Sequence, residues 1–187
     1  MTAPSTVTLT LPREWVEVDP REPDVLGALT RQLDVPPGTG DAVEALLAPL
    51  CIRLARMSAA ADLVLAGFYS EVVEIPEGDP FVMTAQVTLA LSPPVGNLDR
   101  LPEVVGGDGI EVRPVDLPAG RGVLAAGSTE VDDESWDAPQ PAYLRRYFVP
   151  VAGLDRVAAL SFLTPNVALV EEFTEVFDAI AETLAFA

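Results

Sequence analysis

The C-terminal segment, residues 143–187, constrains the fold more than any other part of the chain. Residues 143–151 are rich in aromatic and β-branched side chains, a composition typical of a β-strand. Residues 152–155 predict a short turn, and the apolar run at residues 157–163 predicts a second strand. A hairpin of this kind needs a cover for its apolar face, and the sequence supplies one directly afterwards.

The cover is an amphipathic helix, which we expect to begin at Thr164-Pro165-Asn166, where Thr164 or Asn166 can cap its free backbone N–H groups. Its apolar residues recur at three- and four-residue steps: Leu169, Val170, Phe173, Val176, Phe177, Ile180 and Leu184. Its acidic residues are expected to point the other way: Glu171, Glu172, Glu175, Asp178 and Glu182. The stripe predicts that this helix packs on the hairpin and is essential to the fold.

Further strands are predicted before this segment. The clearest is at residues 81–91, where Phe81, Met83, Ala85, Val87, Leu89 and Leu91 face one way and Val82, Thr84, Gln86 and Thr88 face the other. We expect the first set to meet a core and the second to be at least partly wet, as in many antiparallel sheets. Other strands are predicted at residues 7–11, 15–18, 63–73, 110–117 and 122–131.

Two helices are predicted near the N-terminus. The first runs from Pro23 or Asp24 to Leu33, and the second begins near Asp41. Pro49 lies inside the second pattern and is expected to kink or divide that helix. A short helix is also expected at residues 98–105. The predicted fold class is therefore α+β, one domain over residues 1–187, with an antiparallel β-sheet flanked by N-terminal helices and a long C-terminal helix.

The absence of two residue types limits the chemistry of the chain. It contains no His, and all 11 of its basic residues are Arg. This excludes His-based catalytic triads, His metal ligands, Schiff-base lysines and P-loop phosphate binding. Acid–base chemistry would rest on carboxylates or Tyr. No catalytic residue, cofactor site or metal site is predicted.

Charge and cysteine content indicate the environment and the partners. The net charge of −18 repels nucleic acids and anionic membrane surfaces, and it favours solubility or a basic protein partner. No apolar run reaches the roughly 20 residues that span a bilayer, and the N-terminus lacks the pattern of a signal peptide. The single Cys51 lies in an apolar helical pattern, which predicts a buried, unreactive thiol. A cytoplasmic protein without membrane insertion is expected.

Two short stretches resemble PsbP-like domains. Leu11-Pro12-x-x-Trp15 is similar to the opening of those domains, where a strand leads through Pro to a Trp, and Leu160-Ser-Phe-Leu-Thr-Pro165 with the closing helix is similar to their end. The resemblance implies an α+β sandwich and a binding or adaptor role, as in photosystem subunits, LpqN-type lipoproteins and chaperones of secreted effectors. The N-terminal Cys of the lipoprotein branch is missing, and no functional residue is carried over from the family.

Four residues are candidates for binding a partner: Trp136, Tyr143, Arg145 and Arg146. Trp136 lies in an acidic loop, where it either anchors a partner or packs back on the sheet. That loop, at residues 130–137, lacks the spacing of a calcium-binding EF-hand and is expected to be solvated. Arg145 and Arg146 must point to opposite faces of their strand, so that one can pair with the acidic surface of the terminal helix while the other reaches solvent. Surface pairing is the expected role, and an anion site with Arg113 or Arg121 nearby is the alternative.

Three functions fit these observations. The first is a non-catalytic protein-binding module, such as a chaperone or adaptor for a secreted or effector protein, which takes a basic or extended segment on an apolar patch or a sheet edge. The second is a carrier of a small apolar ligand, with a cavity between sheet and helices. The third is an enzyme that relies on two facing carboxylates, and the missing His and Lys count against it.

Overall fold

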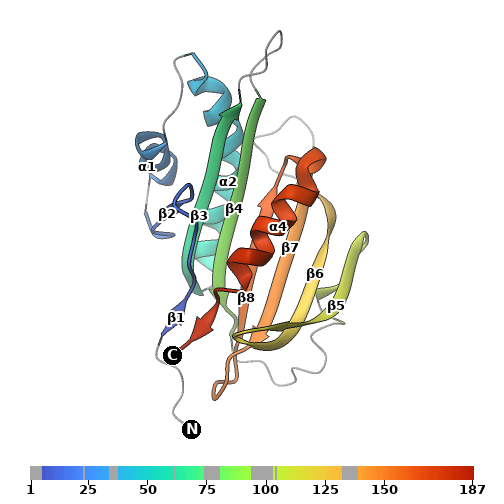
Figure 1. Cartoon of the computed structure of the whole chain (residues 1–187). Coiled ribbons are helices and arrows are strands. Elements are labelled where there is room, and N and C mark those ends of the chain that lie inside the picture. The colour runs from blue at the N-terminus through green and yellow to red at the C-terminus, as the bar shows by residue number, and fades with distance from the viewer. Residues whose placement is uncertain are drawn as a thin grey trace.

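The computed structural model describes residues 6–22, 24–33, 38–60, 62–73, 81–93, 103, 105–131 and 139–187. It is built around an antiparallel seven-stranded sheet with strand order β2-β3-β4-β8-β7-β6-β5 (Figure 1). The strands are β2 (Val16–Val18), β3 (Asp62–Val73), β4 (Phe81–Leu91), β5 (Ile110–Leu117), β6 (Gly120–Val131), β7 (Gln140–Pro150) and β8 (Val157–Thr164). The predicted central strands and their hairpin connections are confirmed.

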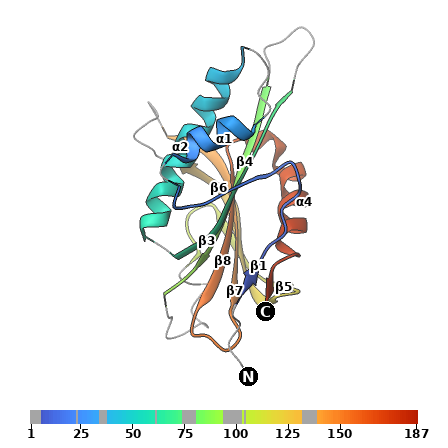
Figure 2. The same ribbon diagram turned by 90° about the vertical axis from the view of Figure 1, so that its left-hand side faces the viewer.

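Helices cover both faces of the sheet, which gives three layers (Figure 2). Helices α1 (Val25–Gln32) and α2 (Gly40–Ala60) lie on one face. Helix α4 (Val170–Ala181), preceded by the 3-10 turn η2 (Val167–Leu169), lies on the other. The α+β class, with N-terminal helices and a C-terminal helix on an antiparallel sheet, is therefore confirmed. None of the described helices is long and apolar enough to cross a membrane.

Each face of the sheet has its own hydrophobic core. The α2 core joins buried side chains of that helix, such as Leu47 and Leu54, to Phe68 on the sheet. The α4 core joins Phe177 to Phe162, whose rings stack with centroids 4.6 Å apart. Because both faces are covered, the central strands β4 and β8 are buried along most of their length.

The polar face of β4 is dry, which corrects the expectation that it is partly wet. Thr84, Gln86 and Thr88 are 0, 2 and 3% exposed. The reason is that α2 lies directly over this face, where Gln86 Nε2 donates to the backbone oxygen of Leu50 at 3.1 Å. Thr84 Oγ1 likewise donates to the backbone oxygen of Tyr69 at 2.9 Å. Hydrogen bonds thus compensate for the loss of water.

The start of the terminal helix also differs from the prediction. Neither Thr164 nor Asn166 caps α4, which begins only at Val170. The Asn166 side chain binds β4 instead, because Nδ2 donates to the Val82 oxygen at 3.0 Å and Oδ1 accepts from the Thr84 nitrogen at 2.7 Å. These groups lie beyond Gln86, where the β4–β8 ladder ends, so Asn166 replaces the missing strand partner.

Three smaller predictions need comment. Helix α2 runs unbroken through the buried Pro49, so of the two expected effects of this residue, a kink or a division, the division is wrong; packing of the apolar face outweighs the lost backbone bond. Strand β1 covers only Val7–Thr8 of the predicted residues 7–11. Of the helix expected at residues 98–105, only Glu103 and Val105 belong to the described residues, and both are helical.

The two ends of the described chain meet on the α4 face. β1 pairs with β9 (Ala185–Phe186), and Thr6 and Ala187 exchange two backbone hydrogen bonds of 2.9 Å (Figure 1). From there residues 9–15, the N-terminal arm, lead to β2 at the edge of the sheet. The arm and α4 therefore form two walls above β3 and β4.

Candidate binding groove

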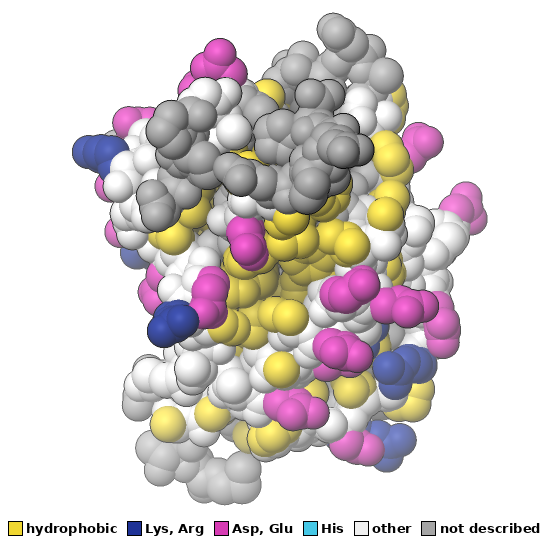
Figure 3. Space-filling model, turned by 45° about the horizontal axis from the view of Figure 1, so that its top comes forward, with side chains coloured by type: hydrophobic (Ala, Val, Ile, Leu, Met, Phe, Trp, Pro, Cys, Tyr) yellow, Lys and Arg dark blue, Asp and Glu magenta, His cyan; other side chains and the backbone are white. Residues whose placement is uncertain are grey.

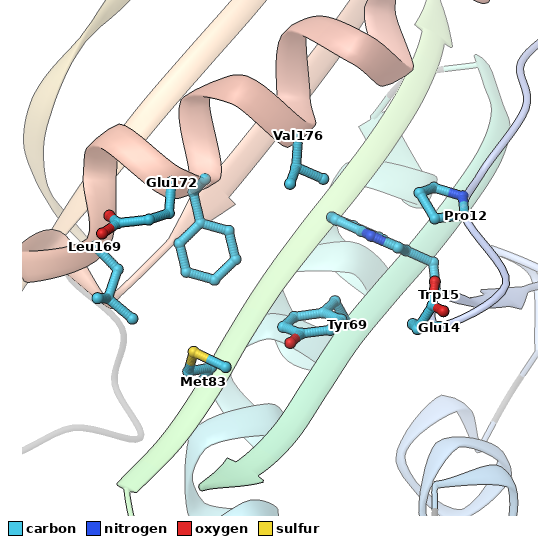
Figure 4. A pocket seen from close by; sticks show the side chains of 9 residues that line it. Pro12, Glu14, Trp15, Tyr69, Met83, Leu169, Glu172 and Val176 are labelled. Atoms are coloured by element: carbon cyan, nitrogen blue, oxygen red, sulfur yellow. The ribbon is translucent and has the colours of Figure 1, made fainter.

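An apolar groove opens between the N-terminal arm and α4 (Figure 4). Its volume is about 330 Å³, within the range of small-molecule pockets. It is lined by Pro12, Glu14, Trp15, Tyr69, Met83, Leu169, Glu172, Phe173 and Val176. The arm and α4 supply the walls, and β3 and β4 supply the floor through Tyr69 and Met83.

The arm is held in place near its start and in its middle. Near its start, the Thr10 nitrogen donates to Thr183 Oγ1 at 2.9 Å, and the same hydroxyl lies 3.3 Å from the Thr10 oxygen. Its middle packs on the sheet at Gly67, where an added Cβ would lie 2.7 Å from a methyl carbon of Leu11. The glycine thus permits the close approach of the arm to β3. The groove wall is therefore part of the folded structure.

Trp15 connects the arm to both the floor and α4. The side chain is 7% exposed, and its ring centroid lies 5.9 Å from that of Tyr69 and 6.4 Å from that of Phe177. Tyr69 also meets Phe173 edge-on at 6.1 Å. Aromatic pairs at these distances are attractive beyond their burial, so ring contacts hold this end of the groove together.

Carboxylates border the apolar surface. Glu14, Glu71 and Glu172, the acidic rim, are all exposed. Figure 3 shows a continuous hydrophobic surface on this side of the molecule with acidic side chains around it. The Tyr69 hydroxyl donates a hydrogen bond to Glu71. The pKa of Tyr69 is raised, mainly by burial and further by this hydrogen bond and the negative charge of Glu71. Arg13 pairs with Glu14 at 2.8 Å and lowers the pKa of that carboxyl, which keeps it ionised.

The predicted candidates Tyr143 and Arg145 lie in a different place, beneath α4. Arg145 forms a two-pronged ion pair with Asp178, with Nε–Oδ1 at 2.7 Å and Nη2–Oδ2 at 2.9 Å. Arg145 Nη1 also donates to the Tyr143 hydroxyl at 3.3 Å, and Tyr147 hydrogen-bonds Asp178. The expectation that one of the two arginines pairs with the terminal helix is confirmed.

This polar cluster attaches α4 to the sheet. The Arg145 side chain is only 7% exposed. Burial lowers the pKa of Arg145, but hydrogen bonds and charges from Tyr147, Tyr143 and Asp178 outweigh it and raise the pKa overall. The pKa of Tyr147 is raised, mainly by burial and second by the hydrogen bond to Asp178. Because β7 is paired on both sides, Tyr143 lies away from the sheet edges where an added strand would bind.

The other two candidates are separated from this cluster. Arg146 points to the α2 face of β7, opposite to Arg145, as strand geometry requires. Trp136 and most of the acidic loop lie outside the described residues. Among the described residues, no three Cys, Asp or Glu side chains are grouped to hold a metal ion.

The sequence patterns did not identify the groove. Val176 was predicted in the buried stripe but is 38% exposed, because the arm stops short of it and leaves the groove between them. Glu172 was expected to face solvent, and it does so at the groove's edge. Trp15 was predicted only as the start of a strand and as a residue of the PsbP-like resemblance, and neither pattern indicates a binding surface. No protein-family model matches the chain, and no curated protein has significant sequence similarity to it.

Proposed function

We propose that this protein is a non-catalytic binding protein that holds an apolar, basic-flanked segment of a partner protein in the groove. The observation that carries the proposal is an apolar groove with an acidic rim. An apolar side chain of the partner would fill the groove between Trp15 and Val176. Lys or Arg side chains on either side of it would meet the carboxylates of Glu14, Glu71 and Glu172.

Charge favours this partner. The chain carries a net charge of −18, so an acidic segment is repelled over the whole surface and a basic one is attracted. The rim carboxylates are exposed and contribute mainly to association rate and specificity, whereas burial of the apolar anchor contributes most of the affinity. Binding is therefore expected to weaken with added salt but to persist.

The extent of the apolar surface favours a protein segment over the second candidate, a small apolar ligand. Beyond Met83, the same face of the β3–β4 hairpin continues with Phe81, 38% exposed, and its cross-strand partner Val73, 36% exposed. A small ligand would fill the groove and leave these side chains in water. A segment of a partner protein covers both, which is the usual role of a contiguous exposed apolar patch.

The biological setting proposed for this binding is that of a chaperone or adaptor. A chaperone for a secreted or effector protein must cover an apolar segment of its client and release it later, which suits an open groove better than an enclosed cavity. Kinship with the PsbP-like domains is part of the same proposal. What supports it is the packing of helices on an antiparallel sheet, since the resemblance implies an α+β sandwich.

The test uses two synthetic peptides with the same apolar residues, one flanked by Arg and the other by Glu. Fluorescence anisotropy measures the affinity of each for the wild-type protein and for Val176→Asp. The matched control is Ile52→Asp, since Ile52 is 37% exposed on α2, in the opposite layer. We expect micromolar binding of the basic peptide to the wild type and to Ile52→Asp, and a loss of at least tenfold in Val176→Asp.

Three outcomes would contradict the proposal: equal binding of both peptides, equal binding to both variants, or no binding of the basic peptide. An uncharged naphthylamine dye that binds tightly in the absence of peptide binding would instead favour the small-ligand carrier. Trp136→Ala extends the test to the fourth candidate, which the proposal also expects to contribute an anchor.

A further inference from the structure

A second polar site lies on the opposite side of the sheet, beneath α2. Arg146 of β7 pairs with Ser161 of β8, which in turn pairs with Thr88 of β4. Directly paired residues project from the same face with Cβ atoms about 5 Å apart. Two hydroxyl-bearing side chains and a guanidinium therefore form one row on the α2 face, and the next residue in the row is the small Ala125.

The guanidinium of Arg146 is incompletely satisfied. Its Nε is enclosed and has no hydrogen-bond partner in the protein. A buried donor attached to a charge is costly to leave unpaired, more so than a neutral one. Arg145 next to it shows the usual solution, since its Nε donates to both Asp178 and Tyr147.

A second arginine approaches the same place from α2. Arg53 lies one turn after Leu50, whose backbone oxygen accepts the hydrogen bond from Gln86 on the sheet. The pKa of Arg53 is lowered to about 10, first by burial and second by the positive charge of Arg146. Burial also lowers the pKa of Arg146. The positive charge of Arg146 thus disfavours the charged form of Arg53.

No described carboxylate neutralises this pair. The described ion pairs join Arg13 to Glu14, Arg145 to Asp178 and Arg156 to Asp62, and neither Arg53 nor Arg146 takes part. The chain has 29 acidic residues for 11 basic ones, so acids are abundant. Two partly buried arginines whose charges interact, with no described acid between them, have the composition of an oxyanion site, because planar guanidinium groups bind pairs of oxygen atoms.

We propose that Arg53 and Arg146, with the hydroxyl of Ser161 beside them, bind a small oxyanion of the phosphate type between α2 and the sheet. The anion accepts from the enclosed Nε of Arg146 and neutralises both guanidinium groups. This site is independent of the groove, because the two lie on opposite faces of the sheet. Either site can therefore be present without the other.

The experiment measures the melting temperature of the full chain in increasing inorganic phosphate, with sodium chloride used to hold the ionic strength constant. A ligand that binds only the folded state raises Tm saturably. We expect a rise of a few degrees at millimolar phosphate for the wild type and for Arg121→Gln, whose arginine is exposed at the start of β6. We expect no rise for Arg53→Gln or Arg146→Gln.

A second measurement covers the case in which a variant folds poorly. Calorimetric titration of the wild type with phosphate and with glycerol phosphate reports binding directly. Tighter binding of the ester identifies a phosphorylated small molecule as the ligand class, and tighter binding of the free ion identifies phosphate itself. The proposal is overturned if the wild type neither binds phosphate nor gains Tm, or if the gain persists in both arginine variants.

Discussion

Trp15 meets Phe177 edge-on, with the two ring centroids 6.4 Å apart. One ring comes from the N-terminal arm and the other from the middle of α4, so this contact joins the two ends of the chain above the sheet. Phe177 is fully buried and also stacks on Phe162 at 4.6 Å and on Phe173 at 5.6 Å. The closing helix therefore holds both the α4 core and the wall of the groove.

The first prediction is that Phe177→Ala destabilises the protein strongly. Removal of a fully buried aromatic side chain leaves a cavity and costs about 3–5 kcal/mol of unfolding free energy. Urea unfolding followed by circular dichroism measures the change. Val176→Ala is the control, because its side chain is 38% exposed and its loss should cost much less. Similar losses for the two variants would show that the α4 core is not packed as described.

The buried polar residues of β4 show how much an alternating strand pattern can predict. Its alternation separates Ala85, Val87 and Leu89 from Thr84, Gln86 and Thr88, and the structure keeps the two sets on opposite faces. The pattern does not say what covers each face. Thr and Gln side chains suggested water, but their polar groups can be satisfied by backbone oxygens, as at Leu50 and Tyr69. Burial was therefore decided by α2, a distant element.

The groove could not be predicted for a related reason. Its residues come from the arm, β3, β4 and α4, and no local periodicity connects them. The three- and four-residue spacing of α4 correctly places Phe173, Phe177 and Ile180 in the core. It includes Val176 as well, since periodicity describes the helix and not the neighbour that fails to cover it. The pairing of one arginine with the terminal helix could be predicted, because adjacent residues of a strand project from opposite faces of the sheet.

The second prediction concerns that pair. Asp178→Ala leaves the guanidinium of Arg145, with its side chain only 7% exposed, without its carboxylate, and should cost roughly 3 kcal/mol. Glu175→Ala, on the exposed side of the same helix, should change stability by less than about 0.5 kcal/mol. Chemical denaturation of both variants checks this. If Arg145→Met in the Asp178→Ala background recovers no stability, the loss does not arise from an unpaired charge.

The third prediction is a loss of stability at alkaline pH. Burial raises the pKa of the Cys51 thiol from 9.0 to about 12, and the charge of Asp24 adds to the shift. The unfolded chain therefore loses this proton first. The protonated thiol therefore makes its full contribution to the free energy of unfolding below pH 9. This contribution is lost as the pH rises from 9 toward 12. The raised pKa values of Tyr69 and Tyr147 act in the same direction above pH 10.

Urea unfolding over a series of alkaline pH values tests this assignment. One proton of difference changes the unfolding free energy by about 1.4 kcal/mol per pH unit, and Cys51→Ala should reduce the slope between pH 9 and pH 10 toward zero. Slopes are compared because the substitution itself also changes the absolute stability. An unchanged slope in Cys51→Ala would mean that the thiol ionises equally in both states.

The last prediction uses Trp15 as a reporter of the groove. The chain has two tryptophans, so Trp136→Phe leaves Trp15 as the single emitter. Its ring contacts Tyr69 on the groove floor and is nearly buried, so a bound apolar side chain must alter its surroundings. We expect the basic peptide to change Trp15 emission with the same midpoint that anisotropy gives for the Trp136→Phe variant, whereas phosphate, bound across the sheet, changes it little. Glu172→Gln should raise the peptide concentration at half-saturation by a fewfold at low salt. At high salt the change should be small, because salt already screens the attraction between Glu172 and the basic side chains of the peptide. Peptide binding that leaves Trp15 emission unchanged, and that Val176→Asp does not weaken, would place the binding surface outside the groove.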